Sequence, residues 1–102
     1  EISSTAPAKI FGLYPRKGSL MVGADADVVV WDPKHRFELS HRNMHMRADY
    51  ASYEGKTVTG APRLVFSRGE LVVDATHGAG HAARLLGRPG RGGFLRRSTF
   101  NL

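Results

Sequence analysis

The residues of this chain that could do chemistry include a closely spaced pair of acids. Asp25 and Asp27 are two residues apart, which places both carboxylates on one side of an extended segment. Two carboxylates on one side could act as metal ligands. Such a pair more often sits at a turn, where the carboxylates accept backbone hydrogen bonds. The spacing alone leaves both roles open, and the turn role is the commoner one.

The histidines form two pairs with a spacing that zinc sites use on helices. His41 and His45 are four residues apart, which on a helix would place both rings on one face. No third ligand lies nearby, and the segment lacks helix signals. His77 and His81 share the spacing but lie among glycines, which disfavour a helix. The histidines therefore give only weak support for a metal site.

Candidate nucleophiles and cofactor-binding residues have no stronger support in the sequence than the candidate metal ligands. Ser67 and Ser98 have no visible base partner, and no Gly-rich phosphate loop precedes a helix. Trp31 and Phe66 fit a hydrophobic core better than a cofactor platform. We therefore predict no catalytic, metal-binding or substrate-binding residue in this chain, and no cofactor bound by it.

The C-terminal segment is basic and rich in glycine. The net charge is +6, but residues 78–102 contain no acid and five arginines: Arg84, Arg88, Arg91, Arg96 and Arg97. The run Gly87–Gly93 is similar to the arginine–glycine boxes that bind RNA through phosphates and stacked bases. The same composition also describes a solvated tail, and Phe94-Leu95 and Phe100 are typical of anchors that dock on protein. The change of composition at Thr76–Gly80 predicts a boundary.

A small, mostly β unit must position these groups. The chain has 102 residues, of which 41% are hydrophobic and 24% charged, as in one ordinary globular domain. It contains no cysteine, which excludes disulfides and thiolate metal sites and favours a reducing compartment, the cytoplasm. No apolar run approaches the ~20 residues needed to span a bilayer. We therefore expect no membrane partner.

The predicted elements centre on a strand at Val28–Trp31, an unbroken apolar run typical of a strand covered on both faces and ended by Asp32-Pro33. A short helix is predicted from Ser4 or Thr5 to Leu13, with strands at 19–22 and 36–40. A loop is predicted over 41–61, with room for a short strand at 56–59. A hairpin pairs 63–66 with 70–73, begins at Pro62 and turns at Gly69. The predicted core comprises Val28, Val29, Val30, Trp31, Leu64, Phe66, Leu71 and Val73.

The order of these segments resembles the C-terminal part of the dihydropyrimidinase and hydantoinase family of cyclic amidohydrolases. The resemblance rests on two long runs, Ser4–Gly18 and Val22–Pro33, and on shorter matches further along the chain: Asp49-Tyr50, Tyr53-Glu54-Gly55, Gly60-Ala61-Pro62, Arg68-Gly69 and Phe94-Leu95-Arg96-Arg97. It covers nearly the whole chain. The chain departs from the family at Ala6, where asparagine is usual, and over residues 75–93, which are longer and richer in arginine and glycine.

The resemblance implies a parent enzyme with a (β/α)8 barrel, a β-sandwich and two zinc ions that activate a hydroxide for attack on a ring amide. The metal-binding motifs of the family are absent from these 102 residues. The chain would then supply the end of the barrel domain (1–18), strands forming the C-terminal half of a composite sandwich (19–76) and an extended basic tail (77–102). On this interpretation the partners are the remainder of the same enzyme and further subunits of a homo-oligomer, such as a tetramer. The expected tail and oligomer contacts are Phe94, Leu95, Arg96 and Arg97.

Two alternatives stay open beside a structural segment of an active hydrolase. The chain could belong to a non-catalytic dihydropyrimidinase-like protein, which would share this pattern but lack metal ligands elsewhere. It could also be an independent basic module that binds RNA through Arg88 and Arg91, although we expect no nucleic-acid partner. The fragment alone is predicted to be inactive under the first two interpretations.

Overall fold

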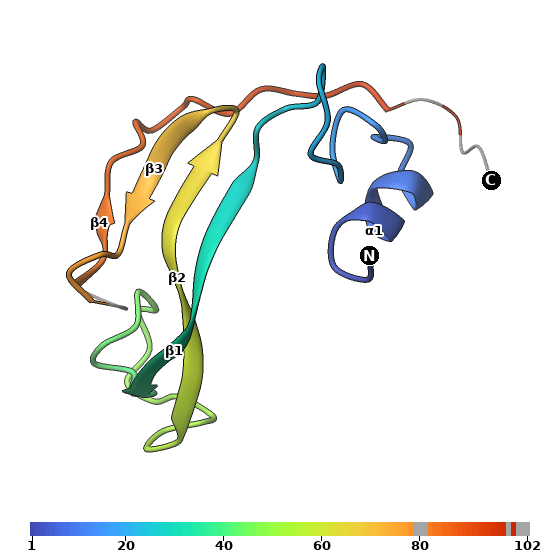
Figure 1. Cartoon of the computed structure of the whole chain (residues 1–102). Coiled ribbons are helices and arrows are strands. Elements are labelled where there is room, and N and C mark those ends of the chain that lie inside the picture. Colours follow the sequence, from blue (N-terminus) through green and yellow to red (C-terminus); the bar gives the residue numbers. More distant parts are fainter. Residues whose placement is uncertain (79–81, 98, 100–102) are drawn as a thin grey trace.

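The computed structural model of the chain describes residues 1–78, 82–97 and 99 (Figure 1). The described elements are a helix followed by four strands: α1 (Thr5–Ile10), β1 (Val28–Glu38), β2 (Thr57–Ser67), β3 (Glu70–Asp74) and β4 (Arg84–Leu85). The strands form one antiparallel sheet in the order β1-β2-β3-β4. In Figure 1 the helix lies beyond the β1 side of this sheet. The prediction of a mostly β chain with a short leading helix is confirmed.

The helix α1 is short and depends on the turn that follows it. Ser4 occupies its N-cap position but makes no side-chain capping bond. Thr5 instead donates from Oγ1 to the carbonyl of Gly18 at 2.7 Å, which ties the start of the helix to residue 18. Ala8 is the buried residue of the helix. A helix of this length is not stable alone, so these contacts hold it.

The strand β1 continues past the proline that was expected to end it. Trp31 lies opposite Pro62 and Asp32 opposite Ala61, and pairing resumes at Arg36 opposite Thr59. Pro33 falls within the register irregularity between Asp32 and Arg36, where the ladder does not require its missing N–H. The predicted end at Asp32-Pro33 is therefore wrong, and the separate strand at 36–40 is the second half of β1.

The strand β2 is likewise one element where two were expected. It runs from Thr57 to Ser67, so Pro62 lies in its middle instead of starting the hairpin. A second register shift, between Val30 and Trp31 of β1, accommodates the proline. The hairpin itself is confirmed. Its turn is Arg68-Gly69, and both residues have positive φ (51° and 79°), as a type I′ hairpin turn requires.

Two other segments differ from the sequence predictions. Residues 19–22 form no strand; they lie in a turn region where the Ala24 amide donates to the carbonyl of Met21 at 3.0 Å. The apolar side chains of Leu20, Met21 and Val22 are exposed. The basic segment is more structured than a tail, because β4 pairs with the outer edge of β3.

The faces of the sheet are largely open. The solvent-accessible surface is 8019 Å², whereas a compact monomer of 11.2 kDa is expected to expose about 5,700 Å². The radius of gyration is 16.1 Å, against about 13 Å for a compact domain of this length. The buried hydrophobic residues of the described part are three alanines: Ala8, Ala61 and Ala75. The described elements do not enclose a core of large side chains.

Candidate functional site

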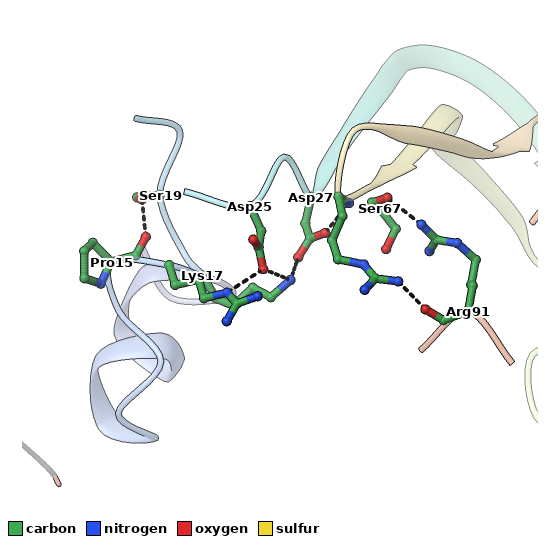
Figure 2. Close-up of polar contacts among 9 residues, drawn as sticks. Pro15, Lys17, Ser19, Asp25, Asp27, Ser67 and Arg91 are labelled. Atoms are coloured by element: carbon green, nitrogen blue, oxygen red, sulfur yellow. Dashed lines mark hydrogen bonds and ion pairs between the residues drawn. The ribbon is translucent and has the colours of Figure 1, made fainter. Parts of the chain in front are cut away.

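A cluster of charged residues forms where the turn after α1 meets the start of β1, and it contains the acid pair noted in the sequence. Arg16 Nε and Lys17 Nζ lie 3.1 and 2.9 Å from Asp25 Oδ2. Lys17 Nζ also binds Asp27 Oδ2. Lys17 therefore bridges the two acids, as Figure 2 shows. We call this group of four charged residues the clasp.

The clasp also reaches the β2–β3 turn. The backbone amide of Arg68 donates to Asp27 Oδ1 at 2.8 Å, and the Gly69 amide donates to the carbonyl of Ala26 at 3.0 Å. The first of these bonds joins residues 41 positions apart in the chain. The interpretation of the acid pair as turn architecture is confirmed at Asp27, whose carboxylate accepts a backbone N–H.

The electrostatics of the clasp leave little capacity for a metal. The hydrogen bond from Lys17 lowers the pKa of Asp25, and it lowers the pKa of Asp27 with help from the Arg68 amide. Partial burial alone would lower the pKa of Lys17, but its hydrogen bonds to Asp27 and Asp25 outweigh this and raise it. Both acids are thus carboxylates already neutralised by cations. Within residues 1–78, 82–97 and 99, no group of three or more His, Asp or Glu side chains could hold a metal ion.

A second polar cluster lies in the loop between β1 and β2. Glu54 accepts hydrogen bonds from Ser40 Oγ at 2.7 Å and from the His41 amide at 2.8 Å, and His41 Nδ1 lies 3.2 Å from the same carboxylate. Both Ser40 and His41 bind the acid instead of each other. A nucleophile would need a serine–histidine contact, so this arrangement closes the loop and activates no hydroxyl.

The pH dependence of this loop follows from Glu54. The Ser40 hydroxyl first, and then the His41 amide, lower the pKa of Glu54 from 4.5 to about 2. A depressed folded-state pKa stabilises the chain above the unfolded value, and the stabilisation is lost as pH falls from about 4.5 to about 2. We expect Glu54→Gln to remove the contribution of Glu54 to the pH dependence of unfolding and Ser40→Ala to raise the pKa of the Glu54 carboxyl. The carboxyl ¹³C shift and urea unfolding across this range measure both effects.

Glu38→Gln, on β1, is the control for this prediction, because no hydrogen bond of its carboxylate is described. It should leave the pKa of the Glu54 carboxyl unchanged. A Glu54 carboxyl that titrates at its ordinary value would contradict the geometry of the loop.

The remaining candidates fall in separate places. His41 lies in a turn and the loop contains no helix, so the helical zinc pair His41 and His45 does not form. His77 lies in the turn after β3, whereas His81, Ser98 and Phe100 fall outside the described residues. Ser67 ends β2, and its carbonyl accepts a hydrogen bond from Arg91 Nη2 at 2.8 Å.

The predicted core residues all line the sheet, but this chain does not cover them. Val29, Val30 and Trp31 are 53%, 45% and 57% exposed. The sequence predicts a strand covered on both faces here, but the described residues of this chain do not provide that cover. The other five predicted core residues are half-buried: Val28, Leu64, Phe66, Leu71 and Val73. An open groove of about 660 Å³ runs between α1 and the start of β1, with Phe11, Leu13 and Val29 among its lining residues.

The tail residues lie beyond the sheet. Phe94, Arg96 and Arg97 are exposed and Leu95 is half-buried. The arginine–glycine run is only partly available to a ligand. Arg91 Nη2 lies 3.0 Å from Glu70 Oε2, and Arg91 Nε donates to the same oxygen at 3.0 Å. One of the two arginines proposed for RNA contact is therefore already paired with an acid.

Several of these polar residues were noted in the sequence, but their partners in the folded chain were not predicted. Lys17 and Asp25 carry opposite charges on the two sides of a glycine-containing turn, a signal that could have suggested their ion pair. The contacts of Arg68 with Asp27 and of Arg91 with Glu70 depend on the folded sheet. No local sequence pattern indicates these contacts.

The chain matches known proteins along nearly its whole length. The sequence profile of the Amidohydrolase family matches residues 1–72. The D-hydantoinase of Ralstonia pickettii is 41% identical over 100 residues, which cover 98% of this chain and 20% of that protein. The chain therefore spans about one fifth of the length of the curated relatives it matches.

Solved structures give the same picture. The D-hydantoinase from Bacillus sp. AR9 superimposes with a TM-score of 0.85 at 41% identity, covering 97% of this chain and 20% of that one. The dihydropyrimidinase from Brevibacillus agri NCHU1002 gives a TM-score of 0.80 at 41% identity, covering 98% of this chain and 20% of that one. No helix in the described part is long and apolar enough to cross a membrane. The resemblance seen in the sequence is confirmed: the chain is homologous to D-hydantoinases and dihydropyrimidinases and belongs to the amidohydrolase family.

Proposed function

We propose that this chain is a structural segment of a hydantoinase-type hydrolase that opens cyclic amide rings. The observation that carries the proposal is the uncovered sheet. The chain exposes 8019 Å², well above the expectation for a compact monomer of its mass. Large apolar side chains lie bare on β1. Apolar surface of this kind marks an interaction site. In this proposal the remainder of the same enzyme covers it and completes a β-sandwich beside a barrel.

The chemistry of the proposed enzyme lies outside this chain. The acids of the clasp are already paired with cations, and the described residues include no group that could hold a metal. The donor set here therefore does not fit a zinc centre. In the proposal, two zinc ions held by other parts of the enzyme supply the activated hydroxide. The role of this chain is to support that domain and to build the assembly.

The tail is the proposed contact between subunits. Phe94 is 91% exposed, and Arg96 and Arg97 are exposed beside it. An aromatic residue next to arginines is the composition enriched at protein interfaces. We propose that this segment, Phe94–Arg97, packs against a neighbouring subunit of a homo-oligomer. The RNA alternative has less support, because Arg91 is engaged by Glu70.

A chimera tests the proposed function directly. The segment of the Ralstonia pickettii D-hydantoinase that aligns with this chain is replaced by residues 1–102, at 41% identity. We expect the chimera to fold and to open hydantoin, because the segment supplies surfaces and no catalytic group. The same enzyme lacking the segment should be insoluble or inactive. Ring opening is followed by loss of hydantoin absorbance.

The isolated chain is the matched control for the chimera. We expect no hydantoin or dihydrouracil hydrolysis by it, with or without added zinc, because the part of the chain that the structure describes contains no group that could hold the metal. Activity of the chain alone would overturn the proposal. A chimera as inactive and insoluble as the truncated enzyme would also overturn it, since the segment would then fail to act as a structural part.

A further inference from the structure

The outer edge of β3 is covered by a segment that follows residues 79–81. β4 pairs Leu85 with Val73 and Arg84 with Asp74. Beyond β4, the amides of Leu86 and Gly87 donate to the carbonyl of Val72 at 2.8 and 3.2 Å. Figure 1 shows this part of the chain running alongside β3. We call residues 84–91 the strap.

The strap lies unusually close to β3 at its middle. A Cβ atom added at Gly87 would come within 3.3 Å of Val72 Cβ and Cγ1. That separation is tighter than ordinary van der Waals contact, so the glycine permits the approach that its backbone hydrogen bond requires. Its φ is not in the left-handed region. A side chain here would therefore act through crowding and not through backbone strain.

Arg91 fastens the end of the strap to the β2–β3 turn. Its guanidinium contacts Glu70 Oε2 on β3 and the carbonyl of Ser67 at the end of β2. In return, the Arg68 guanidinium donates to the carbonyl of Arg91. Figure 2 shows the Arg91 side chain directed toward Ser67. One side chain thus holds the strap to both strands of the hairpin, because guanidinium groups present several donors in a fixed fork.

Without the strap, β3 would expose a row of unpaired backbone groups. β4 contributes only two residues of regular pairing, so much of the cover depends on the fastening at Arg91. A bare edge is a template for pairing with another chain. We propose that the strap, fastened by Arg91, keeps the outer edge of β3 from pairing with a second copy of this chain. The inference concerns residues 84–91 and does not depend on the proposed enzymatic role.

Two variants of the full chain open the strap by independent means. Arg91→Ala removes the guanidinium, and Gly87→Val crowds Val72 without changing charge. Arg88→Ala is the control, because it removes the same charge three residues away and no ion pair of Arg88 is described. Hydrogen exchange of the Leu86 amide, which donates to the Val72 carbonyl, reports release of the strap. The Val65 amide, in the central strand β2, reports the integrity of the sheet.

We expect exchange of the Leu86 amide to accelerate by about tenfold or more in Arg91→Ala and Gly87→Val, with exchange of the Val65 amide unchanged. Arg88→Ala should behave like the unaltered chain. Sedimentation at equal concentration should show larger assemblies for the two strap variants. High salt should accelerate exchange of the Leu86 amide in the unaltered chain, since it screens the partly exposed ion pair of Arg91 with Glu70.

Three results would overturn the proposal. Unchanged exchange of the Leu86 amide in both strap variants would show that Arg91 does not fasten the strap. Faster exchange without larger assemblies would show that the strap does not keep the outer edge of β3 from pairing with a second copy of the chain. Equal acceleration of exchange at the Leu86 and Val65 amides in both variants would show that the segment contributes to global stability and is no separate strap.

Discussion

Gly18→Ala should detach α1 from the rest of the chain. Gly18 has φ +78°, and a Cβ added there would lie 2.5 Å from Ala8 Cβ and 2.9 Å from the carbonyl oxygen of Ser4. Backbone atoms of the helix cannot move aside as a flexible side chain can. The substitution would also disturb the 2.7 Å hydrogen bond from Thr5 to the Gly18 carbonyl. A six-residue helix that loses its support has no stability of its own.

The chain offers a closely matched control in Gly55. It has the same φ, +78°, but nothing lies within 4 Å of the position of its Cβ. Gly55→Ala should therefore cost only the left-handed backbone penalty, about 1–2 kcal/mol. Gly18→Ala should cost about 1–3 kcal/mol more, because it adds overpacking to the same penalty. The difference between the two glycines isolates the contribution of helix docking.

Urea unfolding and hydrogen exchange measure this difference. The Ala8 amide, which donates to the Ser4 carbonyl, and the Tyr14 amide, which donates to the Ala8 carbonyl, should exchange faster in Gly18→Ala. Amides of β2 should keep their protection, because the sheet does not rest on the helix. Equal losses of stability in the two variants would show that the helix is not held by this close contact.

The elements predicted correctly are those whose signals are local. The β2–β3 hairpin turns at Arg68-Gly69 because a glycine accepts positive φ between two apolar runs. The helix begins at Thr5, close to the expected cap, and Pro7 is compatible with its first turn. In each case the chemistry of a few adjacent residues decides the backbone conformation. The sequence shows such chemistry directly.

The errors come from pairing between distant segments. Pro33 and Pro62 would each interrupt an ordinary ladder, so their local chemistry predicts strand ends. In the folded sheet, register shifts beside both prolines let β1 and β2 continue. Residues 19–22 show the reverse error. Their apolar pattern predicts a strand, but no described strand lies beside them, and the side chains of Leu20, Met21 and Val22 are exposed.

The contacts of the clasp also differ in how easily the sequence predicts them, depending on the separation of the partners along the chain. Lys17 and Asp25 flank one turn, and opposite charges on its two sides could have indicated their pairing. Asp27 and Arg68 are 41 residues apart and meet only because the hairpin turn reaches the start of β1. The composition of the arginine–glycine run suggested a nucleic-acid contact. Composition carries no information on Glu70, which pairs with Arg91 of this run in the folded chain.

Val29→Lys should weaken self-association of this chain by at least about tenfold. Val29 and Trp31 share one face of β1, and Val30 lies on the other. All three are about half exposed, and no described strand pairs with the outer edge of β1. An open edge flanked by apolar side chains on both faces favours pairing with another chain. We therefore expect the unaltered chain to associate through β1 at high concentration.

A lysine on β1 opposes this association for two reasons. Burying its ammonium group without a partner is costly, and charged side chains on edge strands are a common means of blocking edge pairing. Val22→Lys is the matched control, since it makes the same chemical change at a fully exposed position outside the sheet. It should leave association nearly unchanged. Sedimentation and light scattering over a range of concentrations measure both variants.

The comparison with Val22→Lys separates a specific surface from a general effect of charge. Both variants add one positive charge to a chain that already carries +6, so repulsion between copies rises equally. A loss of association confined to Val29→Lys would therefore locate the contact on β1, the surface that the remainder of the enzyme covers in the proposed function. An unaltered chain that stays monomeric at high concentration would contradict this use of the β1 edge. Equal effects of the two substitutions would assign the association to net charge instead.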